Sequence, residues 1–361
     1  MEEKKLFHCD GILLLLISIA CVSGLFIVYS ASGGDQAVVS KHGVRVVAGL
    51  VAMLFVAQVP PVVLKRMAAK LYLLAFLLLI AVLIIGVVGK GAQRWLDLGF
   101  MRLQPSELMK LAMPLMVAWW LNNYPLPVRP VQLVVSLAIV IAPTILIMLQ
   151  PDLGTALLIA GSGIIVIFLA GVSWRLILVA LGSACAFIPL LYYFVLHDYQ
   201  RRRILTLFNP WEDPLGAGYH TIQSMIAIGS GGLTGKGWVA GTQSQLDFLP
   251  ERHTDFIFSV FAEEFGFIGF ILLMVLYLAI VFRGIYIAID TRSVFARLLS
   301  GSITLTFFFY VFVNIGMVAG ILPVVGVPLP LVSYGGTSMV TLMIGFGMLM
   351  SVRSHRDVSA H

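Results

Sequence analysis

Charged residues are scarce in this chain. Asp, Glu, Lys and Arg make up only 11% of its 361 residues, whereas soluble domains carry roughly 25%. Hydrophobic residues make up 60% of the sequence, which is more apolar surface than a soluble fold of this length can bury. This composition excludes a disordered chain and a collagen-like repeat. It predicts a polytopic membrane protein.

Cysteine is also rare, and its placement excludes two further classes. The three cysteines, Cys9, Cys21 and Cys185, follow neither a disulfide framework nor a metal-ligand spacing. We therefore expect free thiols. The formal net charge is +6, but no basic tract is interleaved with aromatic residues, so we expect no nucleic-acid partner. In a membrane protein, basic residues set the topology, attract anionic headgroups or hold an anionic substrate.

Long apolar runs dominate what is present. About 20 apolar residues are needed to cross roughly 30 Å of hydrocarbon, and ten runs approach or exceed that length. They lie near residues 12–31, 44–62, 69–89, 105–122, 131–149, 152–171, 174–195, 255–282, 298–321 and 334–352. Gln150, Pro151 and Asp152 divide one long run into a hairpin. We predict an all-α polytopic membrane protein whose residues 1–361 form a single ten-helix membrane domain.

The distribution of basic residues predicts the orientation. An even number of spans puts both termini on the same side of the membrane, and cytoplasmic termini place just over half of the 23 Lys and Arg residues inside. Both termini are thus expected on the cytoplasmic side of the membrane. Many of the other basic residues gather on the extracytoplasmic side, against the usual bias. An anionic ligand on that face would explain them.

One connection is much longer than the others. Residues 197–254, between helices 7 and 8, form a large extracytoplasmic loop, and loops longer than about 15 residues are usually functional. The loop holds the basic triplet Arg201–Arg203, an expected short helix at 219–228 and the glycine tract Gly229–Gly237. The tract lacks the Gly and Ser/Thr positions of a phosphate-binding Walker motif. Two alternatives stay open: a flexible turn, or backbone amides and Lys236 that approach an anion.

Two charged residues inside the fourth run are informative, because a charge in lipid costs several kcal/mol. Glu107 and Lys110 are three residues apart and share one face of a helix. They form either a structural ion pair or the wall of a cavity in which Lys110 meets a phosphate. Asp152, at the start of the sixth run, suits a helix cap.

The segment Leu249-Pro-Glu-Arg-His-Thr-Asp-Phe-Ile-Phe258 is the strongest local signal. It places Arg252, His253 and Asp255 at the outer mouth of the eighth helix, where Asp255 would fall in the first turn. The simple alternative is a capping carboxylate. On a helix, Glu264 faces away from Asp255 and Glu263 lies about 12 Å deeper. A two-carboxylate retaining glycosidase arrangement within this helix is therefore excluded.

A lone carboxylate among cations suits one kind of glycosyl transfer. A sugar linked to a lipid pyrophosphate has a leaving group that needs cations rather than a general acid. The attacking hydroxyl needs one base, for which Asp255 is the candidate. A single displacement inverts the anomeric carbon. Arg102, Lys110, Lys236 and Arg252 are the candidate cations.

Four motifs together resemble the SEDS family (shape, elongation, division and sporulation). They are the segment ending at Phe258, Leu103-Gln-Pro-Ser-Glu-Leu-Met-Lys110, Gln150-Pro-Asp-Leu-Gly-Thr155 and Pro328-Leu-Pro-Leu-Val-Ser-Tyr-Gly-Gly-Thr-Ser338. The resemblance covers the whole chain and is greater to the elongation branch than to the division branch. It implies a ten-helix peptidoglycan glycosyltransferase that polymerises lipid II with a class B penicillin-binding protein.

The residues and the resemblance together give a predicted site. Asp255 is the predicted catalytic base, and the predicted substrate-binding residues are Arg102, Glu107, Lys110, Asp152, Gln223, Ser224, Lys236, Arg252 and His253. We expect no cofactor and no metal ligands, and leave open whether a divalent cation assists. Two alternatives remain: a lipid II flippase or transporter, suggested by the intramembrane charges, and a non-catalytic scaffold for a partner enzyme.

Overall fold

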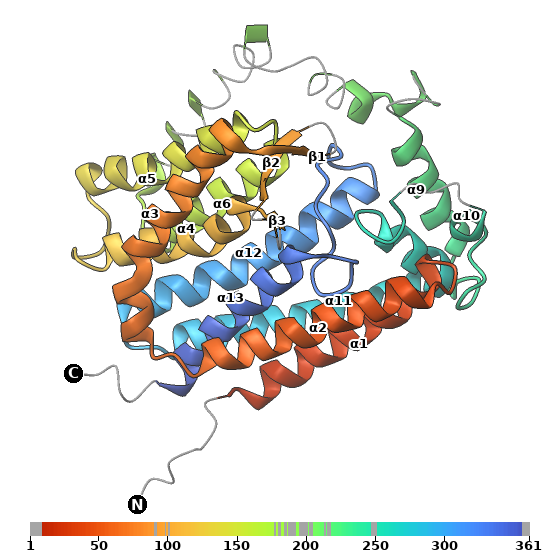
Figure 1. Cartoon of the computed structure of the whole chain (residues 1–361), viewed down its shortest axis with the longest axis horizontal. Helices are drawn as coiled ribbons and strands as arrows, with labels where there is room; N and C mark the ends of the chain where they lie inside the picture. The colour runs from red at the N-terminus through yellow and green to blue at the C-terminus, as the bar shows by residue number, and fades with distance from the viewer. Residues whose placement is uncertain are drawn as a thin grey trace, which may run out of the picture.

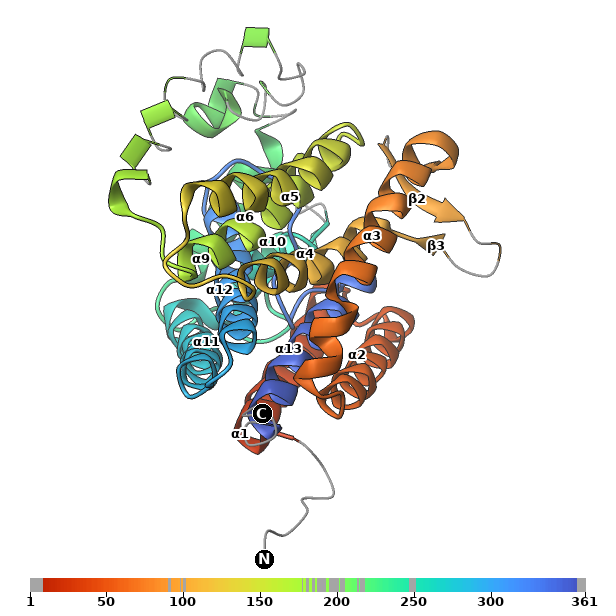
Figure 2. The same ribbon diagram turned by 90° about the vertical axis from the view of Figure 1, so that its left-hand side faces the viewer.

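The computed structural model describes residues 9–89, 92–97, 99, 102–176, 178–179, 182–183, 186, 193–194, 201, 205–212, 214, 218–246 and 251–355. Helices dominate this part of the chain and pack side by side as a bundle (Figures 1 and 2). The long helices are α1 (Gly11–Ala31), α2 (Gln36–Ala57), α3 (Pro61–Ile85), α4 (Pro105–Leu121), α5 (Pro130–Met148), α6 (Leu153–Leu169), α11 (Ile257–Ile289), α12 (Val294–Val318) and α13 (Thr337–Ser354). Among the described residues, seven helices are long and apolar enough to cross a membrane, and α4 and α6 are shorter.

Each predicted apolar run other than 174–195 overlaps one of these helices, but the runs at 44–62 and 69–89 are misplaced, because α2 and α3 each begin eight residues earlier than predicted. The break at Gln150–Asp152 is a turn between α5 and α6, as expected. The seventh run, 174–195, lies largely outside the described residues, as do Arg202, Arg203 and other parts of the loop at 197–254. The total of ten spans and the extent of that loop therefore stay predictions.

The expectation of an all-α chain is wrong between α3 and α4. Three short antiparallel strands form there, β1 (Val87–Gly89), β2 (Ala92–Asp97) and β3 (Arg102–Leu103), in the order β1-β2-β3. Asp97 pairs with Arg102 across the last two strands. The connection between α3 and α4 is too short and too polar to cross the membrane. Pairing between its strands satisfies their backbone N–H and C=O groups.

The core has two parts that meet at α12. One cluster of buried side chains comes mainly from α1, α2, α11 and α13, and the other from α3, α4, α5 and α6. Helix α12 contributes Phe307 to the first cluster and Leu299 to the second. Helices α2 and α13 pack closely because a glycine, Gly347, faces the backbone of Met53.

Helix α11 is interrupted at Gly266, whose φ of 61° and ψ of −158° leave the helical region. The break is filled by the turn that follows α9 (Tyr219–Gly231). The amides of Phe267 and Ile268 donate to carbonyls of that turn, and the amides of Lys236 and Gly237 donate to the carbonyls of residues 263 and 264. These bonds satisfy the backbone groups that the break would otherwise leave unpaired in a membrane protein. The expected helix at 219–228 is confirmed.

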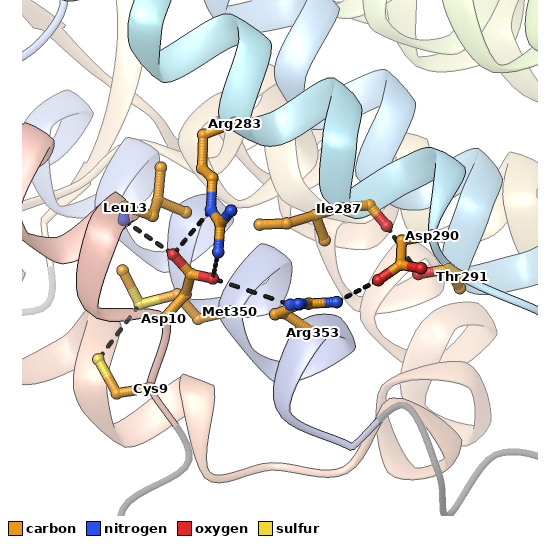
Figure 3. Close-up of polar contacts among 9 residues, drawn as sticks. All are labelled: Cys9, Asp10, Leu13, Arg283, Ile287, Asp290, Thr291, Met350 and Arg353. Atoms are coloured by element: carbon orange, nitrogen blue, oxygen red, sulfur yellow. Dashed lines mark hydrogen bonds and ion pairs between the residues drawn. The ribbon is translucent and has the colours of Figure 1, made fainter.

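The C-terminal end of α11 contacts residues near both described ends of the chain (Figure 3). Asp10 caps α1 by accepting from the amide of Leu13, and it also accepts from Arg283 of α11 at 2.5 Å. Arg353 of α13 lies 4.0 Å from Asp10 and also pairs with Asp290. We call Asp10, Arg283, Asp290 and Arg353 the terminal clamp. It places the start of α1 and the end of α13 at one end of the bundle, whereas Asp255 lies at the other end of α11.

Candidate active site

Asp255 lies in a turn just before α11 and is half-buried. The helix begins at Ile257 with Phe256 as its N-cap residue, and the side chain of Phe256 makes no capping hydrogen bond. Asp255 therefore lies just before the helix rather than in its first turn, and the alternative of a capping carboxylate stays a prediction. The side chain of Asn314, from α12, donates to the carbonyl of Asp255 at 2.9 Å and to the carbonyl of Val327 at 2.6 Å. The backbone that carries Asp255 is thus fixed to α12 and to the segment that follows it.

A partly open cavity of about 110 Å³ lies close to Asp255. A Cβ atom built on Gly326, in the cavity wall, would lie 3.4 Å from Oδ2 of Asp255. The wall comes from α4, α6, α12, α13 and the segment before α13, and its polar members include Lys110, Thr155, Ser162, Thr306, Tyr310, Ser333 and Ser338. The carboxyl group of Asp255 thus lies against the wall of this cavity.

The pair on α4 forms as predicted. Lys110 donates to Glu107 Oε1 at 2.6 Å, and the two side chains are 16% and 10% exposed. The ammonium group also lies 5.7 Å from the centre of the Tyr310 ring. The second oxygen of Glu107 is buried and has no hydrogen-bond partner among the described residues. Because Lys110 lines the cavity, its positive charge is available to an anionic group bound there.

Asp152 caps α6, as expected, by accepting from the amide of Thr155 at 3.3 Å. The guanidinium of Arg94, from β2, lies 3.5 Å from Asp152 and donates to the carbonyl of Pro151 at 2.6 Å. The small sheet is thereby joined to the hairpin between α5 and α6. Since Thr155 lines the cavity, this contact also fixes part of the cavity wall.

His253, in the segment 249–258, contacts Tyr334, in the segment before α13. The ring of His253 packs edge-on against Tyr334 at 5.6 Å, and the amide of Tyr334 donates to the carbonyl of His253 at 2.9 Å. The guanidinium of Arg45, from α2, also lies over the Tyr334 ring, 4.5 Å from its centre. Arg252 reaches toward the turn between α1 and α2, where its Nη2 lies 3.9 Å from the position of a Cβ on Gly33. Arg252 and His253 thus lie within three positions of Asp255 in the chain, and Arg45 contacts the same tyrosine as His253.

Of the nine predicted substrate-binding residues, only Lys110 lines the cavity, within the part of the chain that is described. Four of the other eight lie on elements outside the cavity wall and have partners of their own. Arg102 is 67% exposed in β3 and lies 3.7 Å from Asp97. Gln223 is half-buried on α9. The hydroxyl of Ser224 lies 2.7 Å from the carbonyl of Val318 and so joins α9 to α12. Lys236 pairs with a buried carboxylate, Glu263, at 2.7 Å.

Sequence reasoning missed three residues of the site, Asn314, Gly326 and His220. The side-chain amide of Asn314 lies inside the apolar run 298–321 and could have indicated a buried contact, because a buried polar side chain needs a hydrogen-bond partner. His220, on α9, stacks on Phe256 at 5.6 Å. Burial lowers the pKa of His220, and the charge of Glu251 opposes that shift in part, so we expect a neutral imidazole beside the turn at pH 7.

Among the described residues, no group of three or more His, Cys, Asp and Glu side chains could hold a metal ion. The candidate site consists of Asp255 beside the cavity, Lys110 in the cavity wall with its partner Glu107, and Arg252 and His253, which precede Asp255 in the chain.

Comparison with known proteins identifies the family. A profile of the FtsW, RodA and SpoVE proteins, described as cell cycle proteins, matches residues 10–358. The chain belongs to this family, which is the SEDS family that its motifs resemble, and it is a multi-pass membrane protein.

Within the family the chain is similar to RodA proteins. It is 52% identical over 360 residues to the peptidoglycan glycosyltransferase MrdB of Escherichia coli K12, covering 99% of this chain and 97% of MrdB. A solved RodA structure from Thermus thermophilus matches with a TM-score of 0.73 and 30% identity, covering 97% of this chain and 98% of that one. A chain from a solved peptidoglycan synthase complex, described as coordinating polymerization and crosslinking, matches with a TM-score of 0.84 and 34% identity, with the same coverage.

Proposed function

We propose that this chain is a peptidoglycan glycosyltransferase that polymerises lipid II during cell elongation, with Asp255 as the general base. Asp255 takes the proton of the acceptor hydroxyl, whose oxygen attacks the anomeric carbon of the donor sugar. The bond from that carbon to the lipid pyrophosphate breaks, and its electron pair leaves with the pyrophosphate. The observation that carries the proposal is the Asp255 carboxyl group at the edge of a cavity whose wall holds Lys110.

Cations stabilise the negative charge that develops on the leaving pyrophosphate. Lys110 is the best placed of the candidates, because it lines the cavity and Glu107 fixes its ammonium group. Arg252 would contact the pyrophosphate near Asp255, and Arg102 would contact it at the outer surface. Substrate contacts by the other predicted residues stay predictions, namely Asp152, Gln223, Ser224, Lys236 and His253.

The orientation and the partner are part of the same proposal. Both termini face the cytoplasm across the inner membrane, and the site opens on the extracytoplasmic face, at the end of α11 opposite the terminal clamp. A class B penicillin-binding protein is the proposed partner. The match to a chain of a peptidoglycan synthase complex that couples polymerization to crosslinking supports this choice.

The decisive experiment replaces Asp255 by Asn in the chain purified with its partner. Reaction with lipid II in the presence of a penicillin and moenomycin, followed on a gel, reports polymer made by this chain alone. We expect D255N to keep its melting temperature and its binding of lipid II, and to lose at least about 10²-fold in rate, the typical contribution of a general base. Glu251→Gln, which changes an exposed carboxylate in the same turn, is the matched control.

Full polymerisation by D255N would exclude Asp255 as the base. The flippase alternative is tested by lipid II translocation in liposomes. Translocation by the wild-type chain without polymer in the gel assay would replace the proposed function.

A further inference from the structure

The glycine tract after α9 is joined to the first half of α11 by a buried ion pair. Lys236 Nζ lies 2.7 Å from Glu263 Oε1 and 2.8 Å from the hydroxyl of Thr242. The same carboxylate oxygen is 3.1 Å from the Thr242 hydroxyl, and it accepts from the amide of Gln243 at 3.0 Å. Glu263 is fully buried, with 0% exposure. A charge buried to this extent is tolerated only because cationic and polar donors surround it.

The backbones at this contact are as close as glycine permits. A Cβ on Gly235 would lie 2.1 Å from the carbonyl oxygen of Glu264, and a Cβ on Gly231 would lie 2.1 Å from that of Ala262. Residues 229–237 therefore fit one position against α11, and the Lys236–Glu263 pair and the backbone bonds at Gly266 hold them there.

The first half of α11, residues 257–265, is the element that follows Asp255 in the chain. Because α11 is broken at Gly266, the second half does not by itself fix the direction of the first half. The glycine tract supplies the backbone hydrogen bonds across the break, and the rings of Phe258 and Phe270 contact each other across it. A tilt of about 10° at Gly266, acting over about 14 Å of helix at ~1.5 Å per residue, would move the backbone next to Asp255 by roughly 2 Å.

We propose that Lys236 and Glu263 are positioning residues, which orient the first half of α11 and so place Asp255 against the cavity. This inference rests on the proposed function, because it assigns the pair a task in a reaction that uses Asp255. It differs from the expectation drawn from the sequence, in which Lys236 itself contacts the pyrophosphate. A general base displaced by even 1 Å can cost about 10²-fold in rate.

The test compares Lys236→Met, Glu263→Gln and the double variant in the lipid II polymerisation assay, with the partner present. K236M leaves the Glu263 carboxylate buried without its cation, so we expect kcat to fall about 10²-fold while KM stays within about twofold. The double variant K236M/E263Q removes both charges, and we expect kcat to return to within about fivefold of wild type. Cleavage of residues 219–246 by a protease should be faster in K236M and return to the wild-type rate in the double variant.

The opposite pattern would overturn the inference. If Lys236 contacts the pyrophosphate, K236M/E263Q stays as inactive as K236M and KM rises in both, because the cation is missing from each. Wild-type activity of K236M would also overturn it. If K236M does not fold, the folded double variant decides: activity supports the positioning role, and inactivity refutes it. D255N, measured alongside, separates this result from failure of the proposed function, since an active D255N refutes the general base whatever the pair does.

Discussion

Replacing Lys110 by methionine removes one charge of the pair on α4 and keeps most of the side-chain volume. The ammonium lies 2.6 Å from Glu107 in a site where both side chains are largely buried. Removing one member of a buried pair typically costs about 3–5 kcal/mol, because the remaining charge is uncompensated. K110M should therefore melt at a lower temperature. The double variant K110M/E107Q, which buries no lone carboxylate, should recover most of that loss.

Activity should respond differently from stability. A cation about 4 Å from a phosphate oxygen interacts by roughly 4 kcal/mol at an effective dielectric constant near 20. If Lys110 acts on the leaving pyrophosphate, its loss should lower kcat by about a thousandfold, at 1.36 kcal/mol for each factor of ten. Because the double variant also lacks the cation, it should stay about as inactive as K110M while its melting temperature recovers.

The measurements are thermal melting in detergent and lipid II polymerisation with the partner present. Recovery of kcat to within about threefold of wild type in K110M/E107Q would refute the reasoning and make the pair structural. The two ion pairs should behave differently. Neutralising both residues should rescue activity in K236M/E263Q but not in K110M/E107Q.

Two further predictions concern single contacts. Asn314→Ala leaves the carbonyls of Asp255 and Val327 without the donor that Asn314 supplies, which should destabilise the protein by about 1–3 kcal/mol for each buried group left unpaired. We expect kcat to fall about tenfold or more with little change in KM, as measured by steady-state kinetics. An unchanged kcat would show that Asn314 does not belong to the site. Asp10→Asn weakens the terminal clamp, which is far from Asp255, and should lower the melting temperature while polymerisation at moderate temperature continues. A large loss of activity in a folded D10N protein would contradict that separation.

The features that the sequence predicted well are set by local rules. The spans follow from run length against bilayer thickness, and the Glu107–Lys110 contact follows from a spacing of three residues on one helix. The cap at Asp152 is likewise local. None of these needs knowledge of which helices are neighbours in space.

The features that were missed depend on residues far apart in the chain. Asn314 and Asp255 are 59 positions apart, so only the packing of α12 against the turn before α11 reveals their contact. The break at Gly266 depends on a glycine tract about 30 residues earlier, and the ion pair of Lys236 with Glu263 joins residues that are 27 positions apart. The small sheet was missed because its strands are too short to show a clear alternation of apolar and polar residues.

The terminal clamp has a consequence for how the protein is made. Asp10 emerges first from the ribosome, whereas Arg283 and Arg353 are added near the end of translation. Until then, Asp10 at the start of the first helix lacks the two arginines with which it pairs in the folded protein. This end of the bundle is therefore complete only when the last helix has been synthesised, and a chain truncated before Arg353 would lack part of the terminal clamp.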